Sequence, residues 1–151
     1  MSADASAIVL RVRGFEPGDA EAVAALLEAL GYPCTVVEAK ARIAQFREEA
    51  RQFLLIADRD GAPAGLAAMK LNYSLTRGAD VARLTALVVA EDSYGQGIGR
   101  RLLREMETLA RRNGAIRLEV TSNPSRTGAH AFYHACGYSD GSRHFVKLLG
   151  D

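Results

Sequence analysis

The sequence predicts a single α+β domain over residues 1–151, and three observations support this. The chain has 151 residues, which is close to the commonest size of one domain. Hydrophobic residues make up 48% and charged residues 25%, as is ordinary for a soluble globular protein. Short runs typical of strands are mixed with segments whose apolar residues recur at helical spacing, in an irregular order.

The first predicted elements are one strand and two helices. Residues 8–13 are short and rich in β-branched side chains, which favours a strand. A Pro-Gly break follows, and Asp19 is a good N-cap for a helix over 20–30, where apolar residues recur at i, i+3, i+4 and i+7. A Gly-Tyr-Pro sequence ends that helix, and a second helix is predicted over 37–51.

Three strands are predicted in the middle of the chain. Residues 53–58 and 64–71 are joined across Asp60-Gly61, a dipeptide typical of tight hairpins. The polar residues 72–80 predict a loop, and the apolar run 82–89 predicts the next strand. Three strands without a helix between them do not follow the strict alternation of a parallel α/β protein.

Helices and strands alternate in the last third of the chain. A long helix opens in the glycine-rich residues 95–99, carries a regular apolar stripe, and ends near Asn113. A strand over 116–120, a helix over 126–135 and a last strand over 144–149 are predicted after it.

Charge and cysteine content exclude several classes of function. The 19 basic and 18 acidic side chains give a net charge of +1, which argues against a nucleic-acid or anionic-membrane binder. Cys34 and Cys136 form no metal or redox motif and suit a reducing cytoplasm. No signal peptide or bilayer-length apolar run is visible. We therefore expect a soluble cytoplasmic protein without a metal, a nucleic-acid partner or a membrane partner.

The stretch Tyr94-Gly95-Gln96-Gly97-Ile98-Gly99 carries the strongest functional signal, because it joins an apolar strand to a helix start. Glycines allow a ligand to approach the backbone closely, and a helix N-terminus offers unpaired N–H groups. Together they predict an anion site, most naturally for phosphate. Arg100 and Arg101 oppose the helix dipole unless an anion binds there; the alternative is that both are solvated surface arginines.

Two familiar phosphate motifs do not fit this stretch. No Lys lies nearby, as a P-loop requires. In a dinucleotide fingerprint counted from Gly95, Arg100 would stand where the third glycine belongs.

Four segments of the chain together follow the pattern of one known family: Leu27 to Pro33, Val88 to Gly99, Leu118 to Asn123 and Phe132 to Tyr138. In this order they resemble the GNAT superfamily of N-acetyltransferases. Residues 94–99 after Val88-Val89 resemble its acyl-CoA motif, with Tyr94 where Arg or Gln is usual. Residues 118–123 resemble its strand five and the downstream Asn, and Phe132-Tyr133 with Gly137-Tyr138 resembles its C-terminal signature. Leu27 to Pro33 resembles its N-terminal block. The resemblance implies a three-layer α/β arrangement: a mixed, mostly antiparallel sheet with strands four and five splayed and helices on both faces.

The resemblance also implies acetyl-CoA as cosubstrate, with its pantetheine arm on strand four and its pyrophosphate on the glycine-rich turn. The implied contacts are made by Leu87, Val88, Val89, Tyr94, Gly95, Gln96, Gly97, Ile98, Gly99, Arg100, Arg101 and Asn123. Nine residues separate Asn123 from Tyr133, more than in many members, so its contact stays an open question.

The resemblance implies catalysis by direct attack of an amine on the thioester. Tyr133 is the expected general acid for the departing thiolate, and its alternative is a packing role beside Phe132. The base is open among Glu119, His130 and a water chain. Tyr32 and Glu119 are expected to contact the amine substrate. The alternative for Tyr32 is an aromatic residue that only ends the helix, and the alternative for Glu119 is a carboxylate in an ordinary ion pair.

The implied function is N-acetylation of a primary amine, expected to belong to a small molecule. Residues 27–46 and the predicted loop 72–80 are expected to set acceptor specificity. Two alternatives stay open: a non-catalytic acyl-CoA-binding regulatory module, and a protein lysine or N-terminal acetyltransferase. A homodimer is a further possibility that the sequence does not decide.

Overall fold

The computed structural model describes residues 9–121, 127–142 and 144–150. It divides the chain into two compact units, Met1–Glu119 and Val120–Asp151, and each is described by itself. Within the described ranges, none of the helices has the length and apolar character that crossing a membrane requires.

Five strands form one sheet in the order in which they occur in the chain. They are β1 (Leu10–Gly14), β2 (Gln52–Arg59), β3 (Ala62–Ser74), β4 (Ala79–Val89) and β5 (Ala115–Val120). The pairs β1–β2, β2–β3 and β3–β4 are antiparallel, whereas β5 reaches its place beside β4 through a helix. A helical crossover is the connection that parallel neighbours need, so the sheet is mixed, as predicted.

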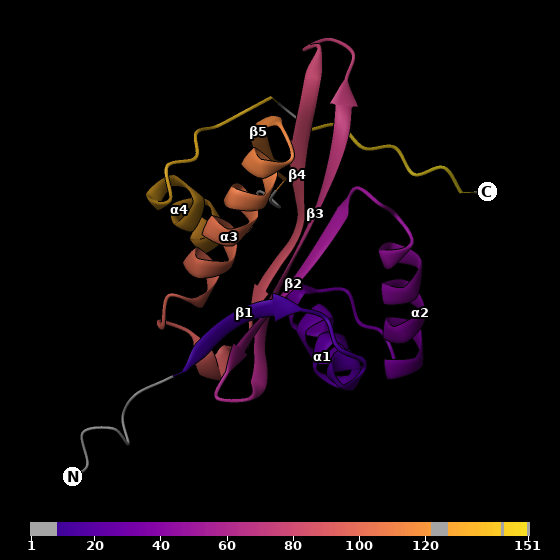
Figure 1. The fold of residues 1–151 in the computed structure, drawn as a ribbon, viewed down its shortest axis with the longest axis vertical. Helices are drawn as coiled ribbons and strands as arrows, with labels where there is room; N and C mark the ends of the chain where they lie inside the picture. Colours follow the sequence, from indigo (N-terminus) through magenta and orange to yellow (C-terminus); the bar gives the residue numbers. More distant parts are fainter. Residues whose placement is uncertain (1–8, 122–126, 143, 151) are drawn as a thin grey trace. The chain divides into compact units, whose positions relative to one another are not determined.

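Helices cover both faces of the sheet in the first unit (Figure 1). Helices α1 (Ala20–Leu30) and α2 (Val36–Arg47) pack on one face, and α3 (Ile98–Arg112) packs on the other. The core under α1 and α2 contains Val23, Leu26, Ile43, Ile56, Leu66 and Val88. The α+β three-layer arrangement predicted from the sequence is therefore confirmed.

Gly65 lets α3 approach the sheet closely. A β-carbon added at Gly65 would lie 3.0 Å from the carbonyl oxygen of Val88 and 3.2 Å from side-chain carbons of Ile98 and Leu102. Its neighbour Leu66 lies in the core under α1 and α2, so the alternation of β3 directs the glycine toward α3. The beginning of α3 is thereby held against β3 and β4.

The hairpin predicted at Asp60-Gly61 joins β2 to β3. Both residues have positive φ, 52° and 90°, as the tight turns of hairpins require. The Gly61 amide donates to Asp58 at 2.7 Å, and the Val9 amide donates to Asp60 at 2.9 Å. The side chains of Asp58 and Asp60 therefore help to fix the geometry of the turn.

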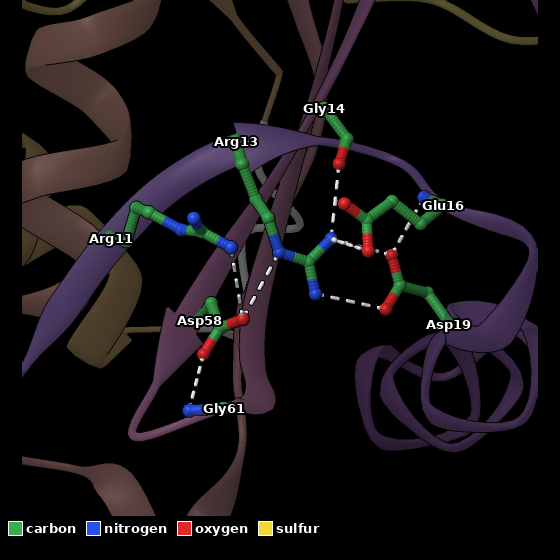
Figure 2. A network of polar contacts seen from close by, with 7 residues as sticks. All are labelled: Arg11, Arg13, Gly14, Glu16, Asp19, Asp58 and Gly61. Carbon is green, nitrogen blue, oxygen red and sulfur yellow. Dashed lines mark hydrogen bonds and ion pairs between the residues drawn. The ribbon is translucent and has the colours of Figure 1, made fainter.

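A polar network joins β1, β2 and the start of α1 (Figure 2). The Arg13 guanidinium donates to both carboxylate oxygens of Asp19, at 2.7 and 3.0 Å, and to Asp58 at 3.0 Å. Asp19 stands at the N-cap position of α1, as predicted, but its side chain does not cap that helix. It closes the 3₁₀ turn over 17–19 instead, accepting from the Glu16 amide at 2.8 Å, because Arg13 already holds the carboxylate there.

The predicted loop over 72–80 is wrong for most of its length. β3 continues to Ser74 and β4 starts at Ala79, so only 75–78 connect them. Asn72 and Tyr73 pair with Val81 and Asp80 in the extended hairpin. Polar residues allow this because backbone hydrogen bonds hold two paired strands together beyond the buried part of a sheet.

The second unit contains α4 (Thr127–Ala135), which ends before Gly137 with its φ of 93°. The strand predicted over 144–149 is wrong, because the structure forms no strand in 144–150. Phe145 and Leu148 are 85% and 87% exposed there. β propensity reflects how well a side chain fits a pleated, paired surface, and composition alone does not provide the pairing.

Candidate functional site

The glycine-rich turn lies between β4 and α3 in the first unit. A short 3₁₀ turn over Glu91–Ser93 follows β4. Gly95 and Gly97 then adopt φ values of 79° and 77°, in the left-handed region that favours glycine, and Gly97 stands at the N-cap of α3. The predicted strand–turn–helix arrangement is present.

The first turn of α3 presents unpaired backbone donors. The Arg101 amide donates to the Gly97 carbonyl at 3.0 Å, which begins the hydrogen bonding of the helix. The amides of Ile98, Gly99 and Arg100 come before Arg101 in the chain. The helix itself offers these first amides no carbonyl acceptor. Buried Ile98, 2% exposed, anchors this end of α3 beside Gly65. Three donors and the positive end of a 15-residue helix are thus held at one place, which favours an anion.

The charged and aromatic side chains predicted at this place differ in their surroundings. Arg100 is exposed, and within the described ranges it takes part in no ion pair. Arg101 lies 3.4 Å from Glu105 on the same helix, as an i,i+4 pair. The Tyr94 side chain is 66% exposed beside the turn. Arg100 is thus the more available cation of the two arginines.

Arg59 also contacts the turn, although no motif in the sequence points to it. Its guanidinium donates to the Gln96 side chain at 3.2 Å and to the Asp92 carbonyl at 3.5 Å. A contact between residues 37 positions apart leaves no local signal in a sequence. Only the arrangement of the hairpin beside the turn reveals it.

The end of β4 offers backbone groups on the edge away from β3. The register with β3 shifts between Ala68 and Met69, which leaves Thr85 as the extra residue of a β-bulge. After the bulge the Ala90 amide donates to Ala64 of β3 at 2.7 Å. Amides of an antiparallel strand alternate in direction, so Val88 also faces β3. The amides of Leu87 and Val89 therefore face the opposite edge.

β5 is the neighbour of β4 on that edge, but β5 is too short to pair along the full length of β4. β5 has six residues and β4 has eleven. Glu119, near the end of β5, forms an ion pair at 3.5 Å with Arg83 in the middle of β4. Leu87 and Val89 lie four and six residues after Arg83 in β4, toward the end of the strand. The predicted splay of the two strands is consistent with this arrangement.

The two residues expected at the amine lie in different environments. Glu119 pairs with Arg83 and, at 3.2 Å, with Arg117, so its carboxylate is already neutralised by two cations. Tyr32 follows Gly31, whose φ of 106° ends α1, and its side chain is 64% exposed. The substrate roles of both residues stay predictions.

An open groove of about 430 Å³ lies along the second half of α2 and the start of β2. Its lining combines one cation, one carboxylate, two amides and an aromatic ring: Ala41, Arg42, Gln45, Phe46, Glu49 and Gln52. It overlaps the end of the segment 27–46 expected to set acceptor specificity.

Tyr133 lies in α4, in the second unit. Its ring makes edge contacts with Phe132 and Tyr138, with ring centroids 5.2 and 5.8 Å apart. Burial raises the pKa of the Tyr133 phenol to about 12. The phenol is therefore a protonated, half-buried donor at neutral pH. Asn123 lies outside the described residues.

Comparison with known proteins identifies the family. Residues 21–138 match the family model described as the acetyltransferase (GNAT) family. The chain is 33% identical over 94 residues to an aminoalkylphosphonate N-acetyltransferase of Salmonella typhimurium, a match that covers 62% of this chain and 61% of that protein. The match thus spans less than two thirds of that relative.

Solved structures share the fold over nearly the whole chain. A GNAT family acetyltransferase of Staphylococcus aureus has a TM-score of 0.78 and 24% identity, with 94% of this chain and 98% of that one covered. The aminoglycoside N-acetyltransferase AAC(6')-Iy, solved in complex with CoA, has a TM-score of 0.83 and 16% identity, with 95% and 96% covered. The family match spans both the glycine-rich turn and Tyr133, and the chain belongs to the GNAT family of acetyltransferases.

Proposed function

We propose that this chain transfers the acetyl group of acetyl-CoA to the primary amine of a small molecule. The observation that carries the proposal is the arrangement at the end of β4. The outward amides of Leu87 and Val89 lead directly into the glycine-rich turn and the unpaired amides of α3. A ligand with a peptide-like arm and a pyrophosphate at its end matches both features.

The residues at this place suit acetyl-CoA, which supplies a thioester whose carbonyl carbon accepts the amine nitrogen. The amides from Gly95 to Arg100 hold the pyrophosphate in this proposal, and two left-handed glycines let it approach the backbone. Arg100 adds an exposed positive charge. Tyr94, Gln96 and Arg101 lie around the same turn and complete the predicted contacts.

The backbone of β4 orients the acyl end. The amides and carbonyls of Leu87 and Val89 can pair with the amide groups of the pantetheine arm as an added strand does. An outward amide at this edge also donates to the thioester oxygen as negative charge develops on it. Val88 contributes its side chain to the core and its backbone to the pairing with β3, so we assign it a supporting role.

We assign to Tyr133 the proton that the departing thiolate needs. A pKa of about 12 keeps the phenol protonated at neutral pH. Against a thiol pKa of about 8.5, complete transfer from the free phenol is uphill by about 5 kcal/mol. The sulfur becomes more basic as the C–S bond breaks and is most basic as the free thiolate, so the proton from Tyr133 moves late in that step.

Glu119 is disfavoured as the base that receives the proton of the amine, because two ion pairs already hold its carboxylate. His130, half-buried on α4, and a water chain stay as the other candidates.

A small-molecule acceptor is supported by the names of the relatives. One acts on aminoalkylphosphonates and another on aminoglycosides, both amines of low molecular weight. The exposed Tyr32 and the groove along α2 belong to the region that we assign to the acceptor. Two free thiols, Cys34 and Cys136, support a reducing cytoplasm as the location.

An acceptor screen tests the proposal. The full chain is incubated with acetyl-CoA and a panel of amines, including aminoalkylphosphonates, aminoglycosides and a lysine peptide, and free CoA is followed. We expect amine-dependent CoA release with a small molecule. Binding of acetyl-CoA without release for any amine would support the regulatory module instead, and release with the peptide alone would support protein acetylation.

A further inference from the structure

Arg59 connects the β2–β3 hairpin to the glycine-rich turn. It is the last residue of β2, and its Nη1 donates to Oε1 of Gln96 at 3.2 Å and to the carbonyl oxygen of Asp92 at 3.5 Å. In the described part of the chain, these are the hydrogen bonds that tie residues 91–97 to a side chain from another element. The guanidinium therefore contacts the turn on both sides of Gly95, the first of its left-handed glycines.

The hairpin that carries Arg59 is itself fixed on both sides. Asp58 accepts from the Gly61 amide and from Arg13 (Figure 2). Asp60 accepts from the Val9 amide. Arg59 also pairs with Leu10 in the β1–β2 ladder. A side chain attached to a rigid backbone segment loses less conformational entropy when it forms a hydrogen bond with defined geometry.

The turn needs such a contact because its own sequence is permissive. Gly95 and Gly97 have left-handed φ values, and glycine loses more conformational freedom on ordering than any other residue. Ser93 and Ile98 are buried, 1% and 2% exposed, whereas the residues from Tyr94 to Gly97 are exposed. Burial thus anchors the two ends of the turn. Its exposed middle is held by the hydrogen bond between Arg59 and Gln96.

We propose that Arg59 is a positioning residue for acetyl-CoA binding, which acts through Gln96 and the Asp92 carbonyl to hold the turn in its phosphate-binding conformation. The inference rests on the proposed function. It differs from direct binding of a phosphate by Arg59, because a direct ligand would not depend on Gln96.

A double-mutant cycle separates these two roles. Acetyl-CoA affinity is measured by calorimetry for the full chain and for Arg59→Ala, Gln96→Ala and the double variant. We expect Arg59→Ala to bind about three- to tenfold more weakly, the usual worth of a lost hydrogen bond. Gln96→Ala should also bind more weakly, and the loss in the double variant should be smaller than the product of the two single losses, because both side chains act partly through their shared contact. Factors that multiply, or a Gln96→Ala variant with parental affinity, would overturn the proposal.

The matched control is Arg112→Ala, which removes an exposed arginine at the other end of α3, about 20 Å from the turn along a 15-residue helix. It should bind as the parent does. Equal weakening in Arg59→Ala and Arg112→Ala would mean that only net charge matters, and would overturn the proposal. Arg59→Gln, whose amide ends two bonds short of the Nη1 position that contacts Gln96, replaces Arg59→Ala if the alanine variant does not fold.

A second readout does not depend on any ligand. Backbone order parameters of Gly95 and Gly97, measured by NMR in the free protein, should fall in Arg59→Ala and stay unchanged in Arg112→Ala. Unchanged order in both variants would overturn the positioning role even if acetyl-CoA binds. A parent that does not bind acetyl-CoA would instead overturn the proposed function, and the order parameters would still decide the role of Arg59.

Discussion

Arg13 and Asp19 form a two-pronged ion pair, with guanidinium-to-carboxylate distances of 2.7 and 3.0 Å and both side chains largely buried. The same guanidinium reaches Asp58 on β2, 3.0 Å away. One side chain on β1 thereby links the start of α1 to the hairpin that carries Arg59. The ion pair thus connects the N-terminal helix to the support of the glycine-rich turn.

Removing Arg13 should be costly. Arg13→Ala leaves the buried carboxylate of Asp19 without its partner, and we expect a loss of about 3–5 kcal/mol in the free energy of unfolding. Arg11→Ala is the control, since Arg11 is exposed and lies 4.0 Å from Asp58; it should lose at most about 1 kcal/mol. Urea unfolding measures both. Equal losses in the free energy of unfolding would contradict a larger contribution from the buried ion pair.

The same pair predicts a dependence on pH. The hydrogen bond from Arg13 holds the pKa of the Asp19 carboxyl below its usual value. A lowered folded-state pKa stabilises the protein above the unfolded value of about 3.9 and loses this contribution as pH falls through the folded value. The stability difference between the parent and Asp19→Asn should therefore stay constant from pH 7 to about 5 and shrink below about 4. A difference that grows on acidification would contradict this.

The close approach of α3 to the sheet predicts a penalty at Gly65. In Gly65→Ala, the new methyl group would lie 3.0 Å from the Val88 carbonyl oxygen, so α3 must move or the strand must distort. We expect a loss of about 1–3 kcal/mol, as in other overpacked cores. Gly14→Ala is the control, because its β-carbon would meet open space. Thermal unfolding of the two variants should separate them clearly.

Tyr133→Phe should abolish most turnover without unfolding the protein. The change removes one hydroxyl and little volume, and we expect kcat to fall about 10²- to 10⁴-fold with little effect on the KM for acetyl-CoA. Because its pKa is about 12, the phenol should cause no loss of parental kcat between pH 7 and 10. Tyr138→Phe, which changes the neighbouring ring, should keep parental turnover. If Tyr133→Phe stays within about threefold of the parent, another group supplies the proton.

Local patterns in the sequence predicted the fold well. The helical stripe of α3, the Asp60-Gly61 hairpin and the glycine-rich turn all depend on neighbours in the chain, and all are present. The predictions that depend on pairing were less accurate. Polar Asn72 and Tyr73 extend β3, and apolar Phe145 and Leu148 form no strand, because a strand is defined by its partner.

The sequence predicted the backbone features of the candidate site, but not the contacts that hold them in place. The glycines and the β4 edge follow from the motif, whereas the contact of Arg59 with Gln96 joins two elements far apart in sequence. Gly65 was missed for the same reason, since only the packing of Ile98 and Leu102 gives it a role. Asp19 shows the converse: its position at the helix start was predicted, but Arg13 determines what its carboxylate does.

The most direct test of acetyl-CoA binding at the start of α3 compares two glycines at the ends of that helix. Gly97 and Gly114 have φ values of 77° and 83°, and a β-carbon at either would meet open space. Alanine at either position should therefore cost about the same stability, roughly 1–2 kcal/mol. Calorimetric titration with acetyl-CoA should show a large loss of affinity for Gly97→Ala and parental affinity for Gly114→Ala. Equal affinities in the two variants would contradict a phosphate site at the glycine-rich turn.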